Sequence, residues 1–259
     1  MDDAGLGRLI RAVELSGGER DEVAVEEPLE IRVDGAALAV TMRTPGQDEE
    51  LALGFLVGEG LIDPQAPPPG VGPTADLAGN IVEVQGPLLR EPPGRRFYTT
   101  SSCGVCGKGA LEEVAVLAPM AAPGPVLSRE RLGGLPDSLG AGQPAFAQTG
   151  GTHATGLFTV DGALLLARED VGRHNAMDKV IGRALLDGLL PLHGHVLCVS
   201  GRLSFELVQK AAVAGVPILV GVGAPSTLAI ALAADRGMTL CGFARAGSVN
   251  VYSAPERVA

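Results

Sequence analysis

The sequence of 259 residues lacks long apolar runs and has little positive charge. No stretch reaches the roughly 18 consecutive apolar residues of a membrane helix, and Met-Asp-Asp opens the chain where a secretory signal would be basic. A formal net charge of −10 argues against binding long nucleic acid, because phosphate neutralisation needs a basic face. With 46% hydrophobic residues, we expect a cytoplasmic protein with a substantial core.

Cysteine is also scarce, with four in the chain. This is too few for a disulfide scaffold, and free thiols are expected in a reducing compartment. Cys198 and Cys241 lie in the strand-like runs HVLCVS and MTLCGF, which predicts that they are small buried hydrophobes. Cys103 and Cys106 lie in SSCGVCGKG, among serines and glycines, where no core packing requires them.

The Cys103-Gly-Val-Cys106 motif is compatible with three roles. A structural zinc site normally needs four ligands, and a second CxxC is missing from the sequence. A thioredoxin-like site follows a buried strand, whereas FYTTSS at 97–102 is a weak, hydroxyl-rich one. The third role is a reactive thiol on a glycine-rich loop, with a thiolate favoured by the following helix N-terminus and Lys108. Spacing alone does not rank the last two.

The segment pattern predicts an α/β protein, α+β overall. Residues 1–24 are charged and predicted to be a flexible leader. Residues 25–100 predict a small α+β domain, with a hairpin at Asp34-Gly35, the helix GQDEELALGFLVGEGLI and the strand NIVEVQ. Residues 101–125 are predicted to hold the mobile CxxC loop, a short helix in GALEEVAVLAPM and a Pro/Gly-rich link.

Residues 126–259 alternate strands and helices at the spacing of right-handed βαβ units, which predicts a sheet covered by helices. A helix-like segment near 129–150 precedes a hairpin at Asp161-Gly162. The remaining helices and strands alternate, and MTLCGFA is predicted to be the last strand.

Polar residues gather at three predicted junctions in this half of the chain. REDVGRHNAMDKVIG at 168–182 is a candidate ligand site, because open α/β sheets bind ligands at the carboxyl ends of strands. The alternative is an ordinary solvated loop with a helix cap. TGGTHATG at 149–156 and SGRLSFELVQK at 200–210 are weaker signals of the same kind. Together the three favour a shared pocket.

These segments resemble the FdhD family, the formate dehydrogenase accessory sulfurtransferases. The resemblance runs from about residue 25 to the end of the chain. It rests on long stretches: EEPLEIRVDG, MRTPGQDEELALGFLVGEGLI, SSCGVCGK, TGGTHATGLF, REDVGRHNAMDKVIG, GRLSFELVQKAAVAGVPILV and GFARAGSVNVYS.

The resemblance implies a sulfur carrier. Family members accept persulfide sulfur from a cysteine desulfurase and pass it to the bis-molybdopterin guanine dinucleotide form of the molybdenum cofactor, before its insertion into formate dehydrogenase. By that likeness Cys103 is the persulfide carrier, Cys106 is the second thiol, and the cofactor is a bound substrate. The family's cofactor-binding segment matches Phe243, Ala244, Arg245, Ala246, Gly247 and Ser248.

The resemblance also implies a cytidine-deaminase-like, three-layer α/β fold for residues 126–259. A zinc deaminase needs H-x-E and P-C-x-x-C. Those places here are His174-Asn175-Ala176 and Ser200-Gly201-Arg202, so we expect neither deaminase chemistry nor a catalytic zinc. The pocket is expected to hold a nucleotide, with phosphate-binding candidates at Arg173, Lys179, Arg202 and Arg245. His174 is a further cofactor-binding candidate.

The expected partners are a cysteine desulfurase, the catalytic subunit of formate dehydrogenase and a guanine nucleotide-containing cofactor, with neither nucleic acid polymer nor membrane. If the protein forms a closed assembly, a homodimer is the commonest kind. Two alternatives are a chaperone that binds cofactor and apo-enzyme without moving sulfur, and a zinc-stabilised binding module.

Overall fold

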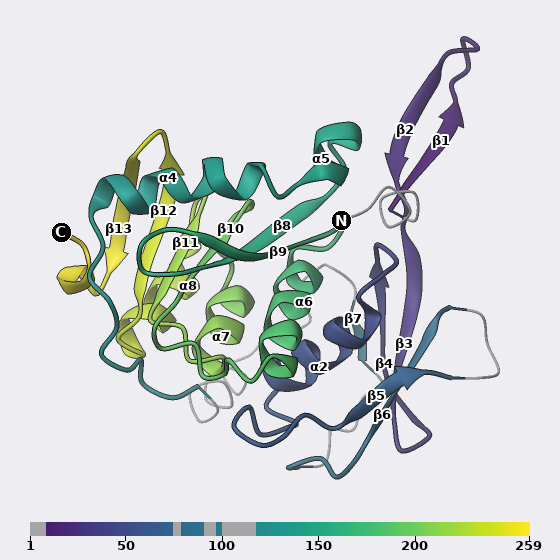
Figure 1. Ribbon diagram of the computed structural model, residues 1–259, viewed down its shortest axis with the longest axis horizontal. Helices are drawn as coiled ribbons and strands as arrows, with labels where there is room; N and C mark the ends of the chain where they lie inside the picture. The colour runs from purple at the N-terminus through teal and green to yellow at the C-terminus, as the bar shows by residue number, and fades with distance from the viewer. Residues whose placement is uncertain (1–8, 75–78, 91–96, 100–117) are drawn as a thin grey trace.

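The described residues build two large β-sheets with a layer of helices between them, and a separate two-stranded hairpin (Figure 1). The computed structural model describes residues 9–74, 79–90, 97–99 and 118–259. Within these ranges, no helix has the length and apolar character needed to cross a membrane.

A five-stranded sheet forms the first part, in the order β5-β6-β3-β4-β7. The predicted hairpin joins β3 and β4, and its turn residues Asp34 and Gly35 have φ values of 47° and 80°, as tight Asp-Gly hairpin turns require. The predicted helix and NIVEVQ strand are present as α2 and β6. The elements are β3 (Glu27–Val33), β4 (Ala36–Arg43), α2 (Asp48–Gly58), β5 (Gly70–Pro73), β6 (Ile81–Gln85) and β7 (Phe97–Thr99).

A six-stranded sheet forms the second part, in the order β13-β12-β11-β10-β8-β9. Its strands are β8 (His153–Phe158), β9 (Leu164–Asp170), β10 (Val196–Val199), β11 (Ile218–Gly221), β12 (Thr239–Arg245) and β13 (Ser248–Ser253). One face packs on α4 (Arg129–Gly140), and the other on α6 (Arg173–Leu186), α7 (Phe205–Val213) and α8 (Thr227–Asp235) (Figure 1). The expected three-layer α/β arrangement is therefore confirmed.

The prediction of a flexible leader is wrong for the end of that segment. Strands β1 (Ile10–Glu14) and β2 (Arg20–Ala24) pair as an antiparallel hairpin that projects from the body (Figure 1). Its base is fixed by the buried side chains of Leu9 and Val25, and Val25 N donates to Leu9 O at 2.8 Å. Most residues of the two strands are exposed, so no apolar alternation marks them in the sequence.

Two further expectations are corrected in the second part. The helix-like segment 129–150 is two helices, α4 and the short α5 (Pro144–Thr149), because Gly140 and Gly142 weaken the end of α4 and Pro144 begins a new helix. MTLCGFA is not the last strand. The chain turns at Ala246 and Gly247, both with positive φ, and returns antiparallel as β13.

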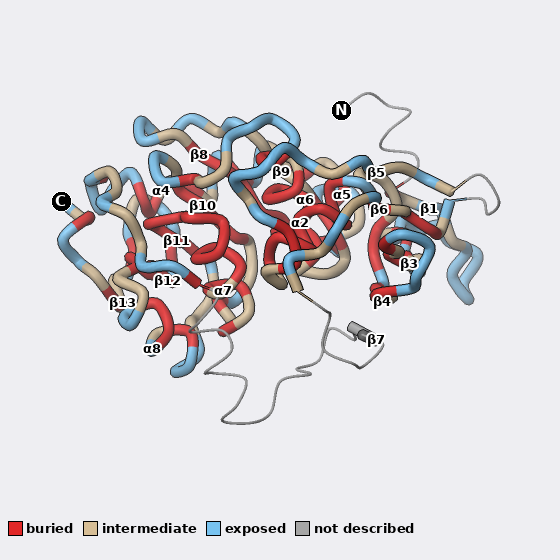
Figure 2. Tube along the Cα trace, turned by 90° about the horizontal axis from the view of Figure 1, so that it is seen from below, coloured by how far each residue is buried: buried red, intermediate tan, exposed pale blue. Residues whose placement is uncertain are grey.

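The two parts share a hydrophobic core, because α2 packs directly against α6 (Figure 2). The helices cross at glycines. A Cβ atom on Gly54 would lie 1.8 Å from Asp178 O, and one on Gly182 would lie 1.8 Å from Glu50 O. The backbones are therefore too close for any side chain at either position.

A methyl group at this crossing should separate the helices. We expect Gly54→Ala to lower the free energy of unfolding by about 1–3 kcal/mol, measured by urea denaturation, because the clash is with backbone atoms that cannot move alone. The matched control is Gly134→Ala in α4, where a Cβ meets nothing within 4 Å. Better helix propensity should raise its stability by roughly 0.5–1 kcal/mol. Equal stability of the two variants would contradict the close crossing.

Candidate functional site

The three polar junctions lie at one edge of the second sheet. Strands β10, β11 and β12 are parallel, and β9 runs in the same direction because β8 is antiparallel to both β9 and β10. The carboxyl ends of these four strands and the amino end of β8 therefore meet at the same edge. This is the edge at which α/β sheets bind ligands.

A pocket of about 380 Å³ opens at this edge, beside α5. Phe146 and Val222 provide apolar surface, while Thr152, His153 and Ser200 provide polar groups. Gly150 and Gly151 also line the pocket and contribute only backbone atoms. The described residues that line it are Gln143, Phe146, Gly150, Gly151, Thr152, His153, Ser200 and Val222.

The buried carboxylate of Glu169 fixes α5 against the sheet. It accepts hydrogen bonds from Ala145 N at 2.9 Å, Phe146 N at 2.8 Å and Thr152 Oγ1 at 2.8 Å. These bonds satisfy free N–H groups of the first turn of the helix, which would otherwise lack partners. The position of the pocket wall therefore depends on a residue of β9.

Two side chains border the pocket from neighbouring elements: His153 at the start of β8 and Arg173 at the start of α6. A Cβ atom on Gly201 would lie 3.5 Å from His153 Nδ1 and 4.0 Å from Arg173 Cδ, so both side chains border the loop after β10. Burial and then the neighbouring Arg173 cation lower the pKa of His153, which favours its neutral imidazole.

His174 points to the loop before α7, with Nε2 3.3 Å from Ser204 Oγ and 3.8 Å from Glu206 Oε2. Its hydrogen bond lowers the pKa of Glu206 to about 2. The carboxylate of Glu206 therefore stays ionised next to His174.

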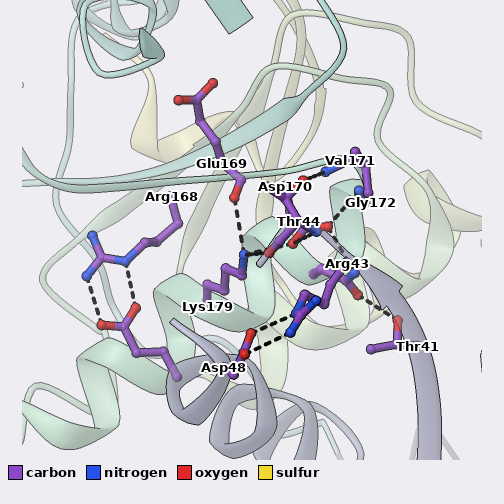
Figure 3. A network of polar contacts seen from close by, with 12 residues as sticks. Thr41, Arg43, Thr44, Asp48, Arg168, Glu169, Asp170, Val171, Gly172 and Lys179 are labelled. Atoms are coloured by element: carbon purple, nitrogen blue, oxygen red, sulfur yellow. Dashed lines mark hydrogen bonds and ion pairs between the residues drawn. The ribbon is translucent and has the colours of Figure 1, made fainter. Parts of the chain in front are cut away.

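Lys179 is the predicted phosphate ligand that the structure does not support. Its side chain is fully buried, and Nζ lies 2.8 Å from Asp170 Oδ2, 2.9 Å from Thr44 O and 3.4 Å from Glu169 O (Figure 3). An ammonium with three oxygen partners and no exposure is not available to a ligand. Lys179 joins the two parts of the fold.

Most of the 168–182 cluster has the same structural role. Arg168 pairs with Glu50 of α2, with Nε 2.6 Å from Oε2 (Figure 3). Asn175 donates to Met42 O at 2.7 Å. These residues were expected to face a ligand. They instead contact residues of the first part of the fold, in α2 and β4. Arg173 and His174 remain partly exposed at the sheet edge.

Backbone hydrogen bonds join the loops after β10 and β11 and the irregular end of β12. Gly223 N donates to Gly201 O at 3.0 Å, and Phe243 N donates to Gly223 O at 3.2 Å. Arg202 lies exposed in the first of these loops. The candidate residues Arg173, Arg202 and Phe243 are thus brought to one edge.

The segment 243–248 is divided between surface and core. A bulge in β12 gives Phe243 a φ of 54° and leaves its side chain 43% exposed. Ala244 is fully buried against α4, so its side chain cannot contact a ligand. Gly247 packs against Gly133 of α4, while Arg245, Ala246 and Ser248 are exposed.

The two candidate cysteines of the CxxC motif, Cys103 and Cys106, lie outside the described residues, as does most of the short helix predicted beside them. The other two match their prediction. Cys198 and Cys241 are fully buried free thiols, and burial raises the pKa of Cys241 to about 12. Over the described ranges, no group of three or more His, Cys, Asp or Glu side chains could hold a metal ion.

Three pocket residues were missed at the sequence level. Gln143 and Phe146 belong to a short helix that the sequence merges with α4, and Val222 follows a buried strand without a polar signal. His153 was noted within TGGTHATG but not chosen as a binding residue. Its place at the start of a strand beside two glycines was the available signal.

Comparison with known proteins relates both sheets to one family. The FdhD/NarQ family model matches residues 24–259. A protein of Streptomyces coelicolor named sulfur carrier protein FdhD is 52% identical over 252 residues, which cover 92% of this chain and 89% of that protein. A relative of the same name in Mycobacterium tuberculosis is 47% identical over 253 residues, covering 92% of both chains.

The fold also matches a solved structure. A crystal structure from Desulfotalea psychrophila, assigned as a formate dehydrogenase accessory protein, aligns with a TM-score of 0.78 and 28% identity. The alignment covers 96% of this chain and 98% of that one.

Phe243 allows a test that separates ligand binding from stability. Its left-handed backbone is strained for a residue other than glycine, and its exposed ring contributes little to the core. We expect Phe243→Gly to keep the free energy of unfolding within about 1 kcal/mol of wild type. Phe243 lies outside the residues that line the pocket, so loss of its ring should weaken GDP binding several-fold by calorimetry only if the ring contacts the sugar–phosphate part of the nucleotide.

Phe243→Ala is the paired variant, because it removes the ring and keeps the strain. Both variants should lose affinity to a similar extent, while only the glycine variant relieves the backbone. Wild-type GDP affinity in both variants would show that the ring does not contact the nucleotide.

Proposed function

Because the chain belongs to the FdhD/NarQ family, we propose that it carries sulfur for the maturation of a formate dehydrogenase. The sulfur comes as a persulfide from a cysteine desulfurase. It goes to the bis-molybdopterin guanine dinucleotide cofactor, the bound substrate, before this cofactor enters the enzyme. The observation that carries the proposal is a pocket at the sheet edge with arginines near it, in a chain that matches named sulfur carriers over most of its length.

Cys103 is the proposed carrier. Its thiolate attacks the outer sulfur of the donor persulfide, the sulfur–sulfur bond of the donor breaks, and the donor cysteine leaves as a thiolate. Cys106 is the second thiol. If it resolves the persulfide, it attacks the inner sulfur of Cys103, releases hydrosulfide and leaves a Cys103–Cys106 disulfide that a cellular thiol must reduce.

The pocket supports binding of the guanine part of the cofactor. Phe146 and Val222 offer apolar surface for a flat base, and none of the described lining residues is an arginine or lysine. Arg173 borders the adjacent loop, and Arg202 and Arg245 are exposed at the same edge. This arrangement favours a base inside the pocket with its phosphates outside, close to these cations.

The carrier role predicts a covalent mass change. After incubation with a cysteine desulfurase and cysteine, we expect an added mass of about 32 Da, one sulfur atom, on the peptide that contains Cys103. Cys198 and Cys241 should remain unmodified, because both are fully buried. Peptide mass spectrometry after alkylation measures all of these sites.

The variants Cys103→Ala and Cys106→Ala complete this test. Cys103→Ala should lose the adduct and fail to activate formate dehydrogenase in a strain that lacks its own factor. A resolving Cys106 predicts that Cys106→Ala accumulates the adduct. Full activation by Cys103→Ala without any adduct would favour the chaperone alternative. Stoichiometric zinc lost in either variant would favour the binding module.

The phosphate role is tested by Arg202→Ala. Removing an exposed cation at the sheet edge should weaken GDP binding roughly tenfold and make it less sensitive to salt, because fewer charges pair with the phosphates. The matched control is Arg183→Ala, since Arg183 lies in the last turn of α6 and pairs there with Asp187. Equal GDP affinity of the two variants would remove Arg202 from the site.

A further inference from the structure

Gln143 is a buried polar residue whose side chain lacks a partner. It lies immediately before α5, is 8% exposed and lines the pocket. Its backbone is bonded, since N donates to Gly140 O at 3.2 Å and O accepts from Ala147 N at 3.0 Å. Among the described residues, no group forms a hydrogen bond with its side-chain amide.

The neighbouring polar side chains of the pocket are already bonded. Thr152 Oγ1 donates to Glu169 at 2.8 Å, and Ser200 Oγ accepts from Ala154 N at 2.9 Å. A primary amide has two donors and an acceptor, and that of Gln143 has no protein partner among the described residues although the residue is 8% exposed. An amide held in the pocket wall without a protein partner is available to pair with a ligand group.

The backbone around this amide is rigid. Glu169 binds the N–H groups of Ala145 and Phe146, the second and third residues after Gln143. Ala145 is itself fully buried. A recognition group fixed in this way binds its ligand without first being ordered, which favours affinity and selectivity.

We propose that Gln143 is a specificity residue of the pocket and recognises the edge of a base that carries a ring N–H next to a C=O. Oε1 accepts from the ring N–H, and Nε2 donates to the carbonyl oxygen. Guanine presents this edge. The inference rests on the proposed function for the presence of a guanine nucleotide, and adds the residue that reads the base.

Two substitutions test the contact with GDP and inosine diphosphate as probes. Gln143→Leu keeps the size but removes all hydrogen bonds, so we expect both nucleotides to bind about tenfold more weakly or worse. Gln143→Glu replaces the amide donor with an acceptor. A carboxylate accepts from the ring N–H and the 2-amino group of guanine, which inosine lacks. The ratio of GDP affinity to inosine diphosphate affinity should therefore rise several-fold above the wild-type ratio.

The control is Gln148→Leu, the same change on the exposed part of α5, which should bind both nucleotides as wild type does. Calorimetry on the full chain gives the affinities, and thermal melting checks folding. A change of ratio is not expected from a structural defect, so Gln143→Glu decides the matter even if Gln143→Leu folds poorly.

The inference is overturned if Gln143→Leu binds GDP as tightly as wild type, or if Gln143→Glu leaves the ratio unchanged. In both cases wild-type binding of GDP leaves the proposed function intact. Absence of GDP binding by the wild-type protein overturns both this inference and the proposed guanine site, while the Cys103 adduct tests sulfur transfer separately.

Discussion

The buried pair between Asp170 and Lys179 connects the two sheets of this protein. Both side chains are fully buried, at 2.8 Å, and Asp170 also accepts from Thr44 N at 3.1 Å and Gly172 N at 2.8 Å. Lys179 also donates to Thr44 O, which fixes the end of β4 to α6. Removing one partner of such a pair typically costs about 3–5 kcal/mol, because the other charge is left buried without compensation. The pair therefore stabilises the contact between the two parts of the fold, in addition to the packing of α2 against α6.

The binding pocket depends on the same strand end. Three consecutive residues of β9 fix four segments: Arg168 fixes α2, Glu169 fixes α5, and Asp170 fixes α6 and the residue after β4. Since successive side chains of a strand point in opposite directions, Glu169 reaches the α5 side and its neighbours reach the other. A displacement of the first sheet would thus act on β9, and through Glu169 on the pocket wall.

The sequence indicated most of the second sheet, because its hairpin and its buried strands have clear apolar patterns. The meeting of three polar junctions at one edge followed from strand direction. The role of Lys179 did not, because a charged cluster between strand and helix has the same composition whether it faces a ligand or another domain. Gln143 was also beyond prediction, since its unpaired amide is a property of packing around α5. The β1–β2 hairpin was missed because exposed strands bury no regular apolar face.

The strained and unpaired groups of this fold lie at the pocket edge, whereas the thiols of the second sheet are buried and unreactive. Phe243 has a left-handed backbone that is unfavourable for a residue other than glycine, and Gln143 has an amide without a protein partner among the described residues. Both lie at the edge where the pocket opens. Backbone strain in proteins is concentrated at functional sites, which fits this location. The thiols of the sheet are different, because burial raises the pKa of Cys198 as well as that of Cys241. A buried thiol that stays protonated near neutral pH is a poor nucleophile for persulfide exchange. Of the four cysteines, Cys103 and Cys106 are therefore the candidates that remain for the proposed sulfur transfer.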